Sequence, residues 1–167
     1  MPSAHDPQGP IKVAYLTYRG KPHVGGQGVY TRHLTKALVD LGHSVEVFGG
    51  QPYPVLDPRV ALTKLPSLDL VNDHYPFRFP AVWELKTRED FYELGLFLTG
   101  TFAEPAAFSA RVKRHLSKRT GEFDLVHDNQ CLGYGILGLE KLIPTIVTLH
   151  HPITRDRALE MDHSPNW

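Results

Sequence analysis

The chain has 167 residues with 18 Lys+Arg and 18 Asp+Glu, so it carries no general positive charge that would attract nucleic acid. Its length suits one domain with a single core, and a hydrophobic content of 41% is ordinary for a soluble globular protein. Cys131 is the one cysteine, which excludes an internal disulfide and is typical of a reducing compartment. We therefore expect a cytoplasmic protein that does not bind nucleic acid.

The first predicted elements are a lead-in, a strand and a helix. Residues 1–10 lack the apolar core of a signal peptide, and we expect them to be disordered. Residues 11–18 are a near-continuous apolar run, the pattern of a strand within a parallel sheet. A glycine-bearing loop and an amphipathic helix follow, and Gly42 stands where a left-handed helix end is expected. The predicted buried stripe of this helix consists of Tyr30, Leu34, Ala37, Leu38 and Leu41.

The later elements alternate between strands and helices. Strands are expected over 43–48, 61–65, 123–127 and 145–150, and helices over 90–98, 105–119 and 135–142. Residues 66–90 mix prolines with aromatic side chains, which predicts an irregular, partly packed excursion. The alternation predicts an α/β fold with a Rossmann-like doubly wound parallel sheet. In such a sheet, ligands gather at the carboxyl ends of the strands.

Three polar clusters follow predicted strands, so the fold should bring them to one edge of the sheet. The clusters are the loop 19–28, the group His127-Asp128-Asn129-Gln130 and the pair His150-His151. In the loop, Gly25, Gly26 and Gly28 precede a helix, whose free N–H groups and dipole favour an anion. A tight turn alone needs one glycine more often than three, so we predict contact with a phosphate-bearing ligand.

The other two clusters admit more than one interpretation. The His127–Gln130 group suits recognition of sugar hydroxyls, and a solvated, helix-capping loop explains it equally well. His150 suits a hydrogen-bonding or acid–base role, with a structural histidine as the alternative. We expect no metal site, because adjacent histidines on a strand point to opposite faces and no metal-ligand spacing supports one.

Other common site classes fit the sequence less well. The glycines lack the G-x-G-x-x-G spacing, and no acidic residue follows Val47-Phe48 to hold a ribose, which disfavours an NAD-dependent dehydrogenase. No Lys-Ser/Thr follows the loop as a Walker A motif requires. The chain also lacks the G-x-S-x-G elbow of a serine hydrolase.

Three segments, in order, resemble the N-terminal half of a family 4 glycosyltransferase with the GT-B fold. Residues 11–48 resemble its opening strand, Gly-Gly loop, helix and L-x-x-x-G-H-x-V-x-V continuation. FDLVHDNQ resembles the family's F-D-V-V-H-x-x strand, and PTIVTLHHP resembles P-x-V-x-T-x-H. The resemblance covers most of residues 11–152, and the excursion over 66–104 is the part that it does not explain.

The resemblance implies a retaining transferase that moves a sugar from a nucleotide-diphosphate sugar to an acceptor without a metal or other cofactor. The backbone at Gly25 and Gly26 would approach the donor diphosphate or the transferred sugar. Gln27 and Gly28 would continue that donor-binding loop. His150 would be the catalytic-site histidine that hydrogen-bonds the donor sugar near the reacting centre.

On the acceptor side, the resemblance places His127, Asp128 and Asn129. The family's donor-binding second domain is not found within residues 11–167, so we expect a truncated acceptor-side domain that is inactive alone. The unpaired sheet edge would then favour self-association of the fragment. The resemblance also leaves room for peripheral membrane contact by the full enzyme. The alternative is a stand-alone, non-catalytic Rossmann-like module that binds a phosphate or a sugar.

Overall fold

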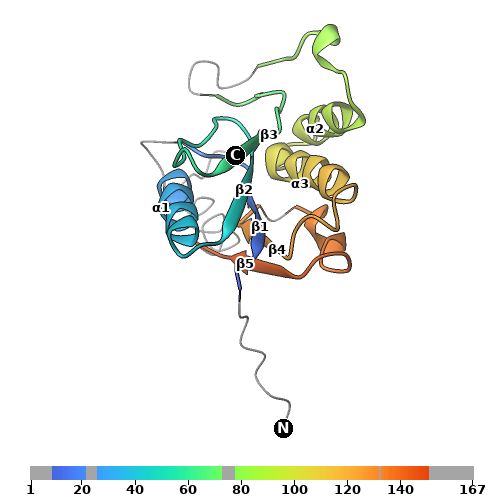
Figure 1. Cartoon of the computed structure of the whole chain (residues 1–167). Coiled ribbons are helices and arrows are strands. Elements are labelled where there is room, and N and C mark those ends of the chain that lie inside the picture. Colours follow the sequence, from blue (N-terminus) through green and yellow to red (C-terminus); the bar gives the residue numbers. More distant parts are fainter. Residues whose placement is uncertain (1–8, 22–25, 73–77, 132, 151–167) are drawn as a thin grey trace.

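The strands form one parallel sheet in the order β3-β2-β1-β4-β5. The computed structural model describes residues 9–21, 26–72, 78–131 and 133–150 (Figure 1). The strands are β1 (Lys12–Thr17), β2 (Ser44–Gly49), β3 (Ala61–Lys64), β4 (Leu125–Asn129) and β5 (Thr145–Thr148). The helices are α1 (Gly26–Asp40), α2 (Arg88–Leu98) and α3 (Ala103–Leu116), with 3₁₀ turns η1 (Val82–Glu84) and η2 (Ile136–Gly138). The predicted strands are confirmed, with ends shifted by a residue or two.

Helices cover both faces of the sheet, as the doubly wound prediction requires (Figure 1). Side chains of β1 alternate between the faces, so Val13 and Tyr15 pack toward α1. On the opposite face, Leu16 joins a core that includes Phe108 and Val112 of α3. Helix α2 packs against α3 and forms an outer layer on that side (Figure 1). The α/β class and its Rossmann-like sheet are therefore confirmed.

Helix α1 buries a different face from the predicted stripe. Its buried residues are Gly28, Thr31 and Thr35, whereas Tyr30 and Leu41 are 37% and 74% exposed. The Thr31 and Thr35 hydroxyls donate hydrogen bonds to the carbonyls of Gln27 and Thr31, each at 2.7 Å. Because these hydroxyls are satisfied within the helix, the two threonines can be buried against the sheet. The hydrophobic pattern counted them as polar and so placed the stripe wrongly, although Leu34 and Leu38 do pack against the core.

Gly42 ends α1 with a φ of +91°, which confirms the predicted left-handed helix end. The helix predicted over 135–142 is wrong, because the structure has only the single turn η2 there. A Cβ on Gly135 would lie 2.3 Å from the Ser109 carbonyl oxygen, so this segment needs glycine to pack against α3. Glycine is a poor helix former, and a continuous helix does not form.

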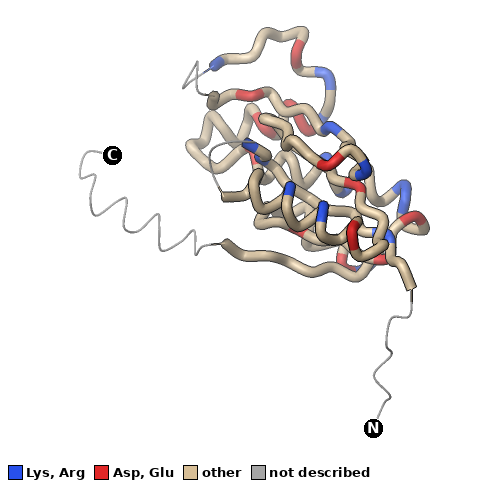
Figure 2. The backbone as a smooth tube through the Cα atoms, turned by 60° about the vertical axis from the view of Figure 1, so that its left-hand side comes forward, with Lys and Arg blue, Asp and Glu red and all other residues tan. Residues whose placement is uncertain are grey.

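The excursion after β3 is irregular and partly packed, as predicted. Leu68 and Leu70 are buried, whereas Phe79 and Trp83 are 71% and 78% exposed. In the view of Figure 2, Lys/Arg and Asp/Glu are interspersed along the described backbone. No helix within the described ranges is both long enough and apolar enough to cross a membrane.

Asp90 connects the start of α2 to α3. Its Oδ2 accepts the Thr87 backbone N–H at 2.7 Å, and the Thr87 hydroxyl accepts the Asp90 N–H at 3.3 Å, which completes a capping box. This cap explains why α2 begins two residues before the predicted start, at Arg88. The other oxygen, Oδ1, accepts a hydrogen bond from Arg111 Nη2 at 2.7 Å, and the same nitrogen lies 2.6 Å from Glu93 Oε2.

We predict that Arg111→Met lowers the free energy of unfolding by about 3–5 kcal/mol, because it leaves two buried carboxylates without their cation. The side chains of Arg111 and Glu93 are 5% and 0% exposed. Arg59→Met is the matched control, since Arg59 pairs with Asp57 and Asp40 at the surface, where water screens the charges and the loss should change stability far less. Urea unfolding measures both, and equal effects would contradict the prediction.

Candidate functional site

Residues from α1, β4 and the end of β5 meet at the carboxyl edge of the sheet. His150 Nε2 lies 2.6 Å from Asn129 Oδ1, and the His150 backbone N–H donates to Gln130 Oε1 at 2.7 Å. The Tyr30 ring meets the His150 ring edge-on, with centroids 4.9 Å apart. The predicted convergence is therefore confirmed for these residues, which we call the carboxyl-edge site. Gly25 and His151 lie outside the described residues.

Two glycines of the predicted donor loop have different surroundings. Gly26 is the first residue of α1, and a Cβ there would meet no atom of the described residues within 4 Å. The space beside it is open, so a ligand could approach the helix start. A Cβ on Gly28, by contrast, would lie 2.0 Å from the Lys21 carbonyl oxygen. Gly28 is therefore required for packing the loop against α1, and Gln27, between the two, is half-buried.

His127 and Asp128 are buried within β4 and face opposite sides of the sheet. The His127 ring packs edge-on against Tyr15 at 4.8 Å, and its Nε2 lies 2.7 Å from Thr148 Oγ1. Burial lowers the pKa of His127 below its usual value. Asp128 Oδ1 accepts the Cys131 backbone N–H at 3.1 Å. The interpretation of this group as a solvated loop is wrong.

Asn129 connects the strand to both other parts of the site. It is fully buried, and its Nδ2 donates to Thr31 Oγ1 of α1 at 3.3 Å. Its Oδ1 faces His150, the exposed member of the pair. Of the three predicted acceptor-side residues, Asn129 is the one that contacts the exposed histidine. No part of Asn129 reaches the surface, so a surface ligand could meet it only through a neighbour such as His150.

A half-buried carboxyl group lies on the α3 side of the same edge, and the sequence analysis missed it. Glu104 is in the first turn of α3, and its Oε2 lies 3.4 Å from Arg19 Nε in the loop after β1. Arg19 also donates from Nη2 to the Val71 carbonyl at 2.9 Å. Burial raises the pKa of Glu104 to about 7, although the Arg19 charge opposes the shift. No motif marks this pair, because its partners come together only through the fold.

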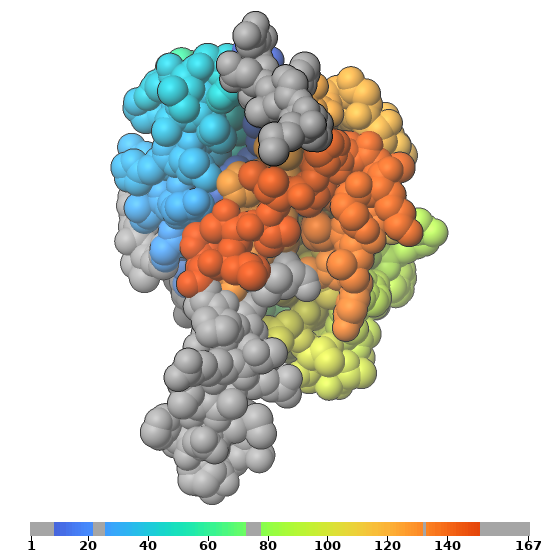
Figure 3. Space-filling view, turned by 90° about the horizontal axis from the view of Figure 1, so that it is seen from below, coloured from blue at the N-terminus to red at the C-terminus, as the bar shows by residue number. Residues whose placement is uncertain are grey.

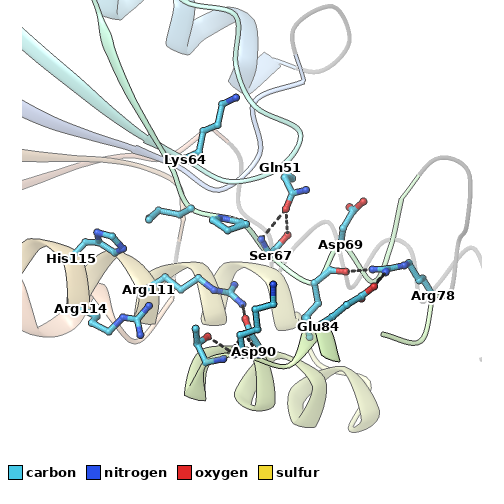
Figure 4. A pocket seen from close by; sticks show the side chains of 15 residues that line it. Gln51, Lys64, Ser67, Asp69, Arg78, Glu84, Asp90, Arg111, Arg114 and His115 are labelled. Atoms are coloured by element: carbon cyan, nitrogen blue, oxygen red, sulfur yellow. Dashed lines mark hydrogen bonds and ion pairs between the residues drawn. The ribbon is translucent and has the colours of Figure 1, made fainter. Parts of the chain in front are cut away.

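A polar cavity of about 430 Å³ lies beside β3, bordered by α2 and α3 (Figure 4). Gln51 and Lys64, from the ends of β2 and β3, line one side of it, and Arg111 and His115 of α3 line another. Gln51 Oε1 accepts the Ser67 backbone N–H at 2.9 Å at the cavity wall (Figure 4). The volume falls within the range of small-molecule sites.

The carboxyl-edge site is bordered by a sheet edge with exposed apolar side chains. Ile146 and Val147 of β5 are 47% and 49% exposed, and Leu149 is 66% exposed. In Figure 3 the segment 133–150, coloured orange to red, crosses the face seen from below and lies beside α1. Among the described residues, β4 is the only strand paired with β5.

Comparison with known proteins identifies the family of this chain. The profile of Glycosyltransferase Family 4 matches residues 24–167, which is most of the sequence. This chain belongs to glycosyltransferase family 4. It is also 55% identical over 159 residues to an MMP alpha-(1->4)-mannosyltransferase of Mycolicibacterium hassiacum. That alignment covers 94% of this chain and 39% of the relative, so the family 4 chain described here spans well under half the relative's length.

The raised pKa of Glu104 makes a testable contribution to stability. The pKa of Glu104 is about 7 in the folded protein, whereas its ordinary value is 4.5. Between pH 4.5 and 7 the unfolded chain releases this proton and the folded protein keeps it, so the free energy of unfolding falls as pH rises through that interval. We predict that Glu104→Gln, which stays neutral, gains stability relative to the parent over that interval. The gain should be on the order of 3 kcal/mol and constant above pH 7.

Urea unfolding at half-unit steps of pH measures the difference between variant and parent. Subtraction cancels the titration of other groups, including His127, which the two proteins share. Glu140→Gln is the matched control, because Glu140 is exposed and the difference should stay near zero. A difference for Glu104→Gln that does not change with pH would show that this carboxyl ionises normally.

Proposed function

We propose that this chain supplies the acceptor-side domain of a retaining, metal-independent glycosyltransferase. In this proposal the enzyme transfers a sugar from a nucleotide-diphosphate sugar to an acceptor in the cytoplasm. The donor-binding domain would lie outside residues 11–167, and the chain alone would not transfer sugar. The chief support is the open helix start at Gly26 together with the exposed His150, held by Asn129 and Gln130 at the same sheet edge.

The two parts of the site suit the two parts of a nucleotide-sugar. The N-terminus of α1 offers backbone N–H groups and a positive dipole end to the diphosphate. A bulky residue at Gly26 would block that approach, because no described residue lies within 4 Å of a Cβ there. His150 offers a ring nitrogen to a sugar hydroxyl near the reacting centre. Mannose is the proposed sugar, since the relative of known activity is named a mannosyltransferase.

The acceptor is proposed to bind on the β2–β3 side of the sheet. His127, Asp128 and Asn129 are buried in β4, on the other side of β1, so in this proposal they would not contact the acceptor. The polar cavity beside β3 offers amide, hydroxyl and charged groups that suit a hydroxyl-rich molecule. Peripheral membrane contact and self-association through the β5 edge stay predictions.

In the full-length enzyme, we predict that Gly26→Leu lowers kcat/KM with a nucleoside-diphosphate mannose by at least about 100-fold, because the side chain blocks the diphosphate. His150→Ala should lower kcat by about 100-fold or more. It also leaves the buried Asn129 Oδ1 without its partner, so the free energy of unfolding should fall by about 1–3 kcal/mol. Gly121→Leu is the control for Gly26→Leu, since a Cβ there also meets open space but lies away from the site.

Steady-state kinetics with a panel of nucleoside-diphosphate sugars provide the measurement. Normal kcat/KM in Gly26→Leu would contradict the donor-loop assignment, and normal kcat in His150→Ala would contradict the role of the histidine. Binding of a sugar phosphate without turnover by the full-length protein would favour the non-catalytic module instead.

A further inference from the structure

We propose that Thr31 and Asn129 fix the tautomer of His150, so that Nε2 carries the proton and Nδ1 presents a lone pair to the ligand. Thr31 and Asn129 would then be positioning residues, and the group that His150 binds would be a hydroxyl. The ligand part of the inference rests on the proposed function. The tautomer itself follows from contacts within the chain.

The hydrogen bonds from the Gln27 carbonyl through Thr31 and Asn129 to His150, which we call the relay, begin at a carbonyl oxygen that can only accept. Thr31 Oγ1 lies 2.7 Å from the Gln27 carbonyl oxygen, so the single hydroxyl proton of Thr31 points there. The nearby Tyr15 hydroxyl also interacts with the Thr31 side chain. Because the Thr31 proton points to the Gln27 carbonyl, Tyr15 can meet Thr31 Oγ1 only as a donor, which leaves Thr31 an acceptor toward Asn129 as well. Thr31 Oγ1 therefore has only lone pairs left to offer.

Those lone pairs decide the orientation of the Asn129 amide. Thr31 Oγ1 can accept but not donate toward Asn129, so the NH2 group must face it, at 3.3 Å. The amide oxygen must then face His150 Nε2, at 2.6 Å. The two amide atoms of a buried asparagine are distinguished by such a network. Asn129 is fully buried, so water cannot supply an alternative partner from the surface.

The orientation of the amide in turn decides the proton on His150. An amide oxygen only accepts, so Nε2 must carry a hydrogen, and Nδ1 of the neutral ring has a lone pair. Within the described part of the chain, no hydrogen bond to Nδ1 is present, and the residue is exposed. The His150 backbone N–H bond to Gln130 and the edge-on Tyr30 ring hold the imidazole in this orientation.

A lone pair at Nδ1 selects the chemistry of the ligand. A phosphate oxygen has no proton to donate at neutral pH, so it gains nothing from the neutral ring. A sugar hydroxyl can donate its proton to Nδ1 and still accept bonds from other groups. The relay therefore assigns the diphosphate to the helix start at Gly26 and a sugar hydroxyl to His150.

Nuclear magnetic resonance of the ¹⁵N-labelled chain tests the relay without any ligand. We expect a Nε2-bound proton on His150, slow enough in exchange with water to be observed. Thr31→Val removes the hydroxyl at nearly constant shape, so the Asn129 amide loses its fixed orientation and the Nε2 proton signal should be lost. A dominant Nδ1–H form in the parent chain would overturn the proposal.

Thr35→Val is the matched control for Thr31→Val. Thr35 is buried on the same face of α1, and its hydroxyl also donates to a carbonyl one turn back, but it makes no contact with Asn129. The His150 Nε2 proton should persist in this variant. Equal loss of the signal in both variants, or its persistence in both, would contradict a relay through Thr31.

A second variant covers the case in which Thr31→Val fails to fold. Asn129→Asp replaces the amide by a carboxylate, whose oxygens only accept, so the His150 Nε2 proton should persist in this variant. Loss of the Nε2 proton in Asn129→Asp would contradict the contact on which the relay depends. A confirmed tautomer combined with an inactive full-length protein would overturn the proposed function and leave the relay intact.

Discussion

The parallel pairing of β4 with β1 is the constraint on which the site depends. Strand β1 pairs with β2 on one side and with β4 on the other, so the chain order reverses at β1. The connection after β1 passes over one face through α1, and the connection before β4 passes over the other through α3. The ends of β1 and β4 are therefore the point where the two layers of helices diverge, which is where doubly wound sheets bind ligands.

At this edge, α1 contacts β4 through neutral polar groups, whereas α3 contacts the loop after β1 through charged groups. On the α1 face, Thr31 and Asn129 join helix to strand by hydrogen bonds between groups that do not titrate. On the α3 face, Arg19 meets Glu104, whose pKa burial raises to about 7. A change of pH near neutrality therefore acts on the α3 side of the glycine loop, while the polarity of the Asn129 amide stays the same.

The sequence predicted the elements that apolar runs define and failed where polar groups are buried. The strands follow continuous apolar runs, so their positions could be read directly. The buried face of α1 could not, because Thr31 and Thr35 are satisfied by carbonyls of their own helix. The meeting of the glycine loop, Asn129 and His150 followed from the fold class alone. The inward orientation of His127 and the Arg19–Glu104 pair depend on packing between distant segments, which no local pattern records.

The burial of Asn129 links stability to the chemistry proposed for the site. An amide removed from water is costly unless both of its ends are bonded, and here one end bonds α1 and the other bonds His150. The histidine is therefore a partner that the core needs, as well as an exposed group for a ligand. Each polar atom of the relay can bond in only one direction. The hydrogen bonds that satisfy the buried Asn129 amide therefore also determine which nitrogen of His150 faces outward. The His150 ring also packs against Tyr30 of α1, the helix whose start would bind the proposed diphosphate.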